Sequence, residues 1–368
     1  MRLVIDCYKL IKGTGKSIGI YNLTKSLVEN LAVSEEVKSG KNEIVVLGNE
    51  ENRQDFEREG VIFRNVGGKP HSKGYLLFWE LILSAKWARK EKADRILFPR
   101  GYRPLVCKVP DAVIIHDLIP FYYDKHFPGV FNRMENMYIM NRLKASIRHA
   151  DRIITISEYS KKEIEAICPK SSDRIRIIYN GYNNVTCGEE YRTSKPYIYA
   201  NTTVLPHKNA GGILKAYEEY RRISSDPLEL VIVGIENAEA YDISEETAKH
   251  VTCYKYIKNF KDVCSIVKGA EAFLFLSLME GFGFPPLEAM QLGVPVVCSD
   301  RSSLPEVTAD AALLVDPEKP NEVALALERI VKDKALRKEL VQKGFENIGR
   351  FSWKSRVPLY WNALEGEK

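Results

Sequence analysis

The sequence lacks the cysteine arrangements that mark disulfide frameworks and zinc sites. Its seven cysteines are an odd number, are scattered along the chain, and include no Cys-x-x-Cys pair. We therefore expect neither a disulfide scaffold nor a cysteine-based zinc site. A reducing cytoplasm is the compartment that fits this pattern best.

Long uncharged apolar runs are absent as well. No run approaches the ~20 residues that a helix needs to cross a bilayer, and the first apolar residues meet Asp6 too early to form the core of a signal peptide. We expect a soluble protein that at most lies on a membrane surface. Nothing resembles a nucleic-acid-binding module, so no nucleic-acid partner is expected.

Charge is unevenly distributed along the 368 residues. Residues 1–186 contain 31 Lys and Arg against 22 Asp and Glu, whereas the remainder contains 23 against 27. The basic half could attract a phosphorylated acceptor or an anionic membrane leaflet, although an ordinary solvated surface is the simpler interpretation. Because a single hydrophobic core rarely grows to this chain length, two domains are expected.

The most informative stretch spans residues 272–290. An apolar run at 272–276 predicts a strand, a Gly- and Pro-rich turn follows, and a helix is expected to begin near Pro286, where proline is tolerated. Glu280 and Glu288 bracket the turn. A strand, a glycine-rich turn and a helix N-terminus together favour phosphate binding, so we predict a sugar-nucleotide site here.

Strands alternate with helices on both sides of this stretch. Strands are expected at 3–5, 43–48, 61–63, 95–99, 111–117, 151–157, 196–201, 228–234, 251–254, 272–276, 294–299 and 311–316. This alternation is typical of parallel, doubly wound α/β domains. A polar run at 182–190 predicts a hinge, with the boundary near residue 186. We further expect a loop at 118–128, one helix over 321–340, and a last helix interrupted near Pro358.

The glycine loop at 12–17 follows the first strand. It does not match a P-loop, because Leu10 stands where that motif needs a glycine. Gly15 and Lys16 are instead expected to let the backbone approach a phosphate or sugar. An ordinary tight turn between strand and helix is the equally weighted alternative.

Two further side chains are placed where ligands bind. His116 ends a predicted strand, and ligands of open α/β sheets lie at the carboxyl ends of strands. Lys208 precedes a predicted helix, where its charge and the free backbone N–H groups both favour anions. A lone histidine is usually structural, but this placement favours a functional role.

The segment 75–92 is apolar at its start and basic at its end, which allows two interpretations. It could lie in a membrane interface as an amphipathic helix with aromatic anchors. Alternatively, its apolar residues pack on the sheet, and we favour this for an α/β domain. The residues concerned are Leu76, Leu77, Phe78, Leu81 and Ile82.

Several motifs in this order resemble family 4 of the glycosyltransferases, which are retaining enzymes with the two-domain GT-B fold. They are 15–17 (GKS), 116–118 (HDL), 152–158 (RIITISE), 179–181 (YNG), 206–209 (PHKN), 280–290 (EGFGFPPLEAM) and 304–307 (LPEV). The resemblance implies an acceptor-binding Rossmann-like domain at 1–186 and a nucleotide-sugar-binding domain at 187–345. It also implies a C-terminal helix at 346–368 that returns to the first domain.

The resemblance also implies roles for individual residues. Glu280 would accept hydrogen bonds from hydroxyls of the donor sugar, and Glu288 would accept those of the ribose. The backbone of Gly281, Phe282 and Gly283 would approach the sugar or its phosphates. Lys208 would hold the diphosphate, and His116 would lie over the donor sugar. Thr202, which we also count among the donor-binding residues, stands where the family generally has an arginine. Lys16 could therefore share the neutralisation of the diphosphate.

The activity implied is retaining transfer of a hexose, mannose or a similar sugar, from a GDP- or UDP-sugar to a saccharide or lipid-linked saccharide. Bacterial surface polysaccharide assembly, of O-antigen or capsule, is the expected setting. No cofactor is implied, and the lack of an Asp-x-Asp pair agrees with metal-independent transfer. The alternatives are a catalytically impaired sugar-nucleotide-binding protein, a sugar-nucleotide epimerase, or a phosphorylase, which would need a much longer chain.

Overall fold

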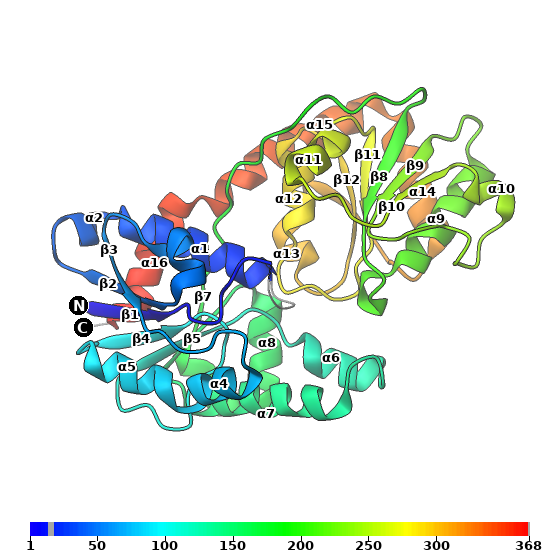
Figure 1. Cartoon of the computed structure of the whole chain (residues 1–368). Coiled ribbons are helices and arrows are strands. Elements are labelled where there is room, and N and C mark those ends of the chain that lie inside the picture. Colours follow the sequence, from blue (N-terminus) through cyan, green and yellow to red (C-terminus); the bar gives the residue numbers. More distant parts are fainter. Residues whose placement is uncertain (14–17, 367–368) are drawn as a thin grey trace. The chain divides into compact units, whose positions relative to one another are not determined.

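The computed structural model describes residues 1–13 and 18–366 and divides into two compact units (Figure 1). The first unit comprises Met1–Gly181 together with Ser352–Lys368, and the second comprises Tyr182–Phe351. The chain thus returns to the first unit at its end. These boundaries lie a few residues from positions 186 and 346, where the sequence places them.

The first unit is built on a parallel sheet of seven strands in the order β3-β2-β1-β4-β5-β6-β7. The strands are β1 (Arg2–Asp6), β2 (Glu43–Gly48), β3 (Val61–Asn65), β4 (Arg95–Phe98), β5 (Asp111–Ile115), β6 (Arg152–Thr155) and β7 (Ile175–Ile177). The helical segments are α1 (Ile18–Ala32), α2 (Glu35–Lys38), η1 (Glu50–Asn52), α3 (Arg53–Phe56), α4 (Lys73–Phe78), η2 (Trp79–Leu83), α5 (Ser84–Lys90), α6 (Ile119–His126), α7 (Arg133–His149), α8 (Glu158–Ile167), η3 (Pro169–Arg174) and α16 (Trp353–Glu365).

The inner residues of the central strands are apolar on both sides because helices cover both faces of this sheet. Helices α1 and α16 lie on one face, and α4, α5 and α7 lie on the other (Figure 1). Val4 of β1 is in register with Val45 of β2 and Ile96 of β4, and all three are fully buried. Such continuous apolar strands are typical of parallel sheets, as the sequence predicts.

The second unit repeats this design with a parallel sheet of six strands in the order β10-β9-β8-β11-β12-β13. The strands are β8 (Tyr197–Asn201), β9 (Glu229–Val233), β10 (Val251–Tyr254), β11 (Ala272–Phe275), β12 (Val296–Ser299) and β13 (Ala312–Val315). The helical segments are η4 (Pro206–Lys208), α9 (Ala210–Ile223), α10 (Glu245–Ala248), α11 (Phe260–Lys268), α12 (Phe284–Gln291), α13 (Leu304–Thr308), α14 (Pro320–Lys332), α15 (Lys334–Ile348) and η5 (Gly349–Phe351).

Each sheet has one point at which the strand order reverses. In the first sheet β1 and β4 are neighbours, and in the second β8 and β11 are neighbours, so that the chain proceeds outward from each pair in both directions. Ligands of open α/β sheets bind beyond the carboxyl ends of the strands at such points. The carboxyl ends of these two strand pairs are therefore where a site is expected in each unit.

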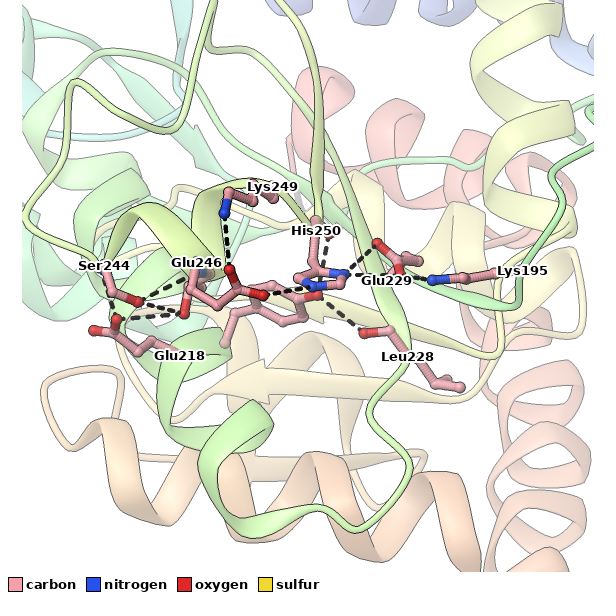
Figure 2. Close-up of polar contacts among 10 residues, drawn as sticks. Lys195, Glu218, Leu228, Glu229, Ser244, Glu246, Lys249 and His250 are labelled. Atoms are coloured by element: carbon pink, nitrogen blue, oxygen red, sulfur yellow. Dashed lines mark hydrogen bonds and ion pairs between the residues drawn. The ribbon is translucent and has the colours of Figure 1, made fainter.

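A polar cluster of the second unit lies at the opposite, amino edge of its sheet (Figure 2). Glu229, the first residue of β9, accepts from Lys195 (Nζ to Oε1, 3.0 Å) and lies 3.1 Å from Nδ1 of His250, which directly precedes β10. Burial opposes ionisation of Glu229, but the hydrogen bonds from His250 and Lys195 outweigh it and lower the pKa of the carboxyl. This cluster connects the first residues of β9 and β10, at the end of the sheet opposite the carboxyl ends of the strands.

Three of the predicted elements differ in the structure. The expected loop at 118–128 contains α6, which tolerates Pro120 because its second position needs no intrahelical N–H donor. The expected helix over 321–340 is two helices, separated at Asp333, whose carboxylate accepts from the N–H groups of Ala335 and Leu336 and caps α15. The last helix, α16, continues through Pro358 without interruption.

The favoured interpretation of segment 75–92 was wrong for three of its five apolar residues. Leu77, Phe78 and Ile82 are exposed, whereas Leu76 packs against the core. The cause is the π-helical segment η2, which widens the turn between α4 and α5 and brings both Trp79 and Glu80 to the interior. None of the described helices is long and apolar enough to cross a membrane.

Candidate functional site

The turn between β11 and α12, residues 276–283, forms the centre of the candidate site. Hydroxyls of the loop after β12 hold its backbone. Ser303 Oγ donates to the carbonyl oxygens of Glu280 (3.0 Å) and Phe282 (2.7 Å), and the N–H of Glu280 donates to Ser302 Oγ (2.9 Å). The turn is therefore fixed in place before any ligand contacts it.

The loop after β8 holds the beginning of the same turn. The N–H of Leu278 donates to the carbonyl of His207 (2.7 Å), and Asn209 Nδ2 donates to the carbonyl of Leu276 (3.2 Å). Asn209 has a left-handed backbone (φ 57°) and caps α9 by accepting from the N–H of Gly212. Asn209 thus ends the loop that carries Lys208 (the lysine loop), caps α9 and holds the neighbouring turn.

Gly283 is required at the start of α12 for two reasons. Its φ of 127° is one that other residues rarely adopt, and a Cβ atom there would lie 2.7 Å from Leu304 Cδ2. Gly281 and Gly283 are buried, yet in the described part of the chain their N–H groups donate to no acceptor. Buried unpaired N–H groups are uncommon in proteins, and beside a helix N-terminus they favour an anion.

The structure brings Lys208 and Glu280 together above this turn. Lys208 Nζ lies 2.6 Å from Glu280 Oε1, and the two side chains retain 24% and 12% of their exposure. They come from the loops that follow β8 and β11, the neighbouring strands at which the strand order reverses. A partly exposed ion pair in this position can exchange its partners for charged and hydroxyl groups of a ligand.

Thr202 lies beneath the lysine loop and does not present its hydroxyl to a ligand. The residue is 3% exposed, and its Oγ1 donates to the carbonyl of Lys208 (2.9 Å). A Cβ atom at Gly234 would lie only 1.9 Å from the carbonyl oxygen of Thr202, so a glycine after β9 is needed for this packing. The role of Thr202 in the structure is to support Lys208.

His207 does not replace the arginine that the family resemblance would place beside Lys208. Burial, reinforced by the positive charge of Lys208, lowers the pKa of His207 to about 4. The imidazole is therefore neutral near pH 7. Positive charge at this loop comes from Lys208.

Glu288 is the fifth residue of α12, the helix that directly follows the turn. Burial raises the pKa of its carboxyl to about 7, and its charge acts on Tyr182, Tyr199 and Cys264 nearby. No described residue hydrogen-bonds to this carboxyl. Both of its oxygens are thus available to hydroxyl groups of a ligand.

His116 lies in the first unit, directly after β5. Its Nε2 is 2.7 Å from the carbonyl oxygen of Pro99, and burial lowers the pKa of the ring to about 4. The neutral ring must donate from Nε2 to that carbonyl, which leaves Nδ1 as an acceptor. Gly15 and Lys16 lie outside the described residues.

Sequence reasoning thus named Lys208, Glu280, Glu288 and the glycines of the turn, but it missed their supports. Ser302, Ser303 and Gly234 have no recognisable motif of their own. Their signal is only positional, because each immediately follows the end of a strand or lies within a few residues of it. Polar and glycine residues at strand ends are worth weighing in any parallel sheet.

Comparisons with known proteins agree for both units of the chain. Residues 31–184 match the family model of Glycosyltransferase Family 4, and residues 189–347 match that of glycosyl transferases group 1. O-antigen chain mannosyltransferase B of Escherichia coli is 28% identical over 302 residues, which cover 76% of each chain. O-antigen chain mannosyltransferase RfbU of Salmonella typhimurium is 28% identical over 238 residues, 61% of this chain and 64% of that protein.

The fold is shared with solved glycosyltransferase structures. Sucrose-phosphate synthase from Thermosynechococcus elongatus superposes with a TM-score of 0.66 over 98% of this chain and 97% of that chain, at 17% identity. At this identity the likeness concerns the fold alone. The two family matches show that this chain belongs to glycosyltransferase family 4, the retaining, nucleotide-sugar-dependent enzymes with the GT-B fold.

Proposed function

We propose that this chain transfers mannose from a nucleoside-diphosphate sugar, GDP- or UDP-linked, to a saccharide or lipid-linked saccharide in bacterial surface polysaccharide assembly. The similarity to the two O-antigen mannosyltransferases supports mannose and this setting. The nucleotide sugar is a co-substrate, and we propose a transfer that uses no cofactor and no metal ion.

The observation that carries the proposal is the pairing of Lys208 with Glu280 beside the unpaired N–H groups of Gly281 and Gly283. A diphosphate would take the ammonium group and the two N–H groups, and the sugar hydroxyls would donate to Glu280. Cationic and N–H donors held in place stabilise charge that develops on a leaving diphosphate, which lowers the barrier to its departure. Glu288 would accept from the ribose hydroxyls.

Retention in this proposal needs no enzyme nucleophile. The leaving diphosphate would take the proton of the acceptor hydroxyl on the same face of the sugar ring. Glu280 binds hydroxyls in this scheme and does not act as one of two carboxylates on opposite sides of the bond, as in retaining glycosidases. Neutral His116 would contact a sugar hydroxyl either through its ring, where Nδ1 can accept, or through its backbone.

The test is nucleoside-diphosphate release from a panel of nucleotide sugars, with and without saccharide acceptors. We expect Lys208→Ala and Glu280→Ala each to reduce transfer at least ~100-fold, the scale of one lost preorganised contact. Lys249→Ala is the matched control, because it removes an exposed ion pair with Glu246 (3.0 Å) at the amino edge of the sheet (Figure 2). Near-normal turnover of both folded site variants would refute the assignment.

The same panel separates the alternatives. An epimerase would convert the donor sugar in the absence of any acceptor. A sugar-nucleotide-binding protein would be stabilised by the donor in a thermal shift assay and would release no nucleoside diphosphate.

We further propose that the first unit contacts an anionic membrane through one apolar surface, defined by Leu77, Phe78, Ile82, Leu105, Val106, Met134 and Met137. All seven side chains are exposed. The three segments that carry them are joined, because the N–H of Leu105 donates to the carbonyl of Leu81 and Tyr138 donates to Glu80. Exposed basic residues, among them Lys73, Lys86, Lys108 and Arg133, belong to the same segments or flank them.

Flotation with liposomes tests this membrane contact. We expect the protein to float with anionic vesicles at low salt and less with neutral vesicles. Replacing Phe78 and Met134 by serine should reduce flotation, whereas Leu325→Ser, an exposed leucine of the second unit, should not. Absence of flotation with anionic vesicles at low salt would refute the contact.

A further inference from the structure

The carboxyl ends of β1 and β4 in the first unit carry a concentration of charged side chains that donor binding does not use. These two strands are neighbours at the point where the strand order reverses, which is where ligands of such sheets bind. Asp6 ends β1, and Lys9 follows it by three residues. On the other strand, Arg100 and Tyr102 follow Phe98, the last residue of β4.

The two acidic groups at this edge have partners within the protein. Asp6 accepts from Trp79 Nε1 (3.0 Å) and from the N–H of Tyr8 (3.2 Å). Glu80 is 6% exposed and lies 2.7 Å from Lys9 Nζ. Lys9 is thus committed to an internal ion pair.

Arg100 and Tyr102, in contrast, retain unused donors. Arg100 is half-buried, and within the described residues its guanidinium forms no hydrogen bond or ion pair. Its Cζ lies 5.9 Å from the centroid of the Tyr102 ring, and its charge also acts on the carboxylate of Asp6. The hydroxyl of Tyr102 likewise has no hydrogen-bond partner among the described residues. A cation and a phenol are therefore side by side, and no described residue accepts a hydrogen bond from either side chain.

The backbone beside Arg100 is held rigidly next to His116. Pro99, the preceding residue, accepts from His116 Nε2 at 2.7 Å. Gly101, the following residue, has a φ of 79°, and a Cβ atom there would lie 3.1 Å from the carbonyl of Ile114 on β5. Arg100 is thus fixed between β4 and β5, close to the residue proposed to lie over the donor sugar.

We propose that Arg100 and Tyr102 form a binding site for an anionic group of the acceptor, a phosphate or a carboxylate. A guanidinium offers two parallel N–H donors that match the geometry of both groups, and the phenol adds a third donor. The inference rests on the proposed glycosyl transfer, because it assigns the acceptor side of that reaction. It implies that the accepting saccharide carries negative charge near the hydroxyl that is glycosylated.

Binding of small probes to the full chain tests this site without turnover. The donor site is first saturated with GDP. α-Mannose 1-phosphate, methyl glucuronoside and neutral methyl α-mannoside are then titrated and followed by ligand-observed NMR. The first two probes distinguish phosphate from carboxylate, and the third measures binding through sugar hydroxyls alone.

We expect the wild-type protein to bind at least one of the two anions more tightly than the neutral sugar. Arg100→Gln should weaken that anion by about tenfold or more, the scale of a lost charge-assisted hydrogen-bonded pair. Tyr102→Phe should weaken it less, and Arg100→Lys should give an intermediate loss. Arg148→Gln, which removes an exposed arginine of α7, is the matched control and should have no effect.

Three results would overturn the inference. The first is that the wild-type protein and folded Arg100→Gln bind the anion equally well, and the second is that the wild-type protein binds neither anion measurably. The third is that Arg100→Gln binds GDP more weakly than the wild type, which would assign Arg100 to the donor. Failure of the proposed function gives a different result. A chain that binds no GDP and no nucleotide sugar refutes the donor site, while the anion titration, performed without GDP, still reports on Arg100.

Discussion

Glu288 gives a prediction in which pH controls binding of the donor. Its carboxyl has no hydrogen-bond partner among the described residues, and burial raises its pKa to about 7. In the proposed function this group accepts hydrogen bonds from two ribose hydroxyls, a role that requires the ionised form. At any pH at which Glu288 is protonated in the free protein, binding of the donor must therefore release that proton.

The magnitude follows from that pKa. With a pKa of about 7, Glu288 is about nine-tenths ionised at pH 8 and about one-tenth ionised at pH 6. The Kd for GDP should therefore rise roughly tenfold between pH 8 and pH 6. Neutral His207, with a pKa of about 4, does not titrate in this range.

Isothermal titration calorimetry with GDP at pH 6, 7 and 8 measures both the affinity and, in buffers of different ionisation enthalpy, the proton release. Glu288→Gln is the control, since the phosphate of GDP also titrates near pH 6 and does so equally with both proteins. The variant should bind GDP more weakly at pH 8 and lose the additional tenfold dependence. A wild-type pH profile that matches the variant's would refute the reasoning.

The same shift has a consequence for the free protein. Because the folded state raises the pKa of Glu288 from 4.5 to about 7, it binds this proton more tightly than the unfolded chain. The contribution of this proton to the stability of the folded protein is complete below pH 4.5 and is lost as the pH rises to 7. The free energy of unfolding of Glu288→Gln minus that of the wild type should therefore be larger at pH 8 than at pH 5.

Two further substitutions probe the turn itself. Gly283→Ala should lower the free energy of unfolding by about 1–3 kcal/mol, because alanine at this φ is strained and its Cβ would contact Leu304. Urea denaturation measures this change. Gly74→Ala, where nothing lies within 4 Å of the added Cβ, is the control and should lose no stability. Ser303→Ala should cost about 1–3 kcal/mol and raise the donor KM, because it removes the donor to two buried carbonyls of the turn. The exposed Ser355→Ala should change neither quantity, and equal effects of the two serine substitutions would contradict the support assigned to Ser303.

The fold class could be predicted because its physical cause is written locally in the sequence. Strands such as β2 and β11 are covered on both faces, so their residues are apolar without alternation, and helices must follow them to return the chain. The cap of α8 is equally local, because the side chain of Ser157 accepts from the N–H of Ser160, three residues later. Such signals depend on a few adjacent residues.

Features that depend on distant residues could not be read in this way. Lys208 and Glu280 are 72 residues apart, and they meet at 2.6 Å only because β11 lies beside β8 in the sheet. The family resemblance linked them, whereas periodicity could not. The supports of the turn, Ser302 and Ser303, depend in the same way on β12 being the next strand in order.

The π-helical segment η2 has a consequence for how this protein can tolerate change in chain length. A π turn holds one residue more than an α turn, and here the additional residue lets two adjacent side chains point inward. Trp79 then reaches Asp6, and Glu80 reaches Lys9 and Tyr138. Deleting a single residue from this segment would leave a regular α-helix, a locally favourable result. It would nevertheless turn either Trp79 or Glu80 away from the interior. A homologue that is one residue shorter would therefore need other residues to hold Asp6 and Lys9 at the end of β1.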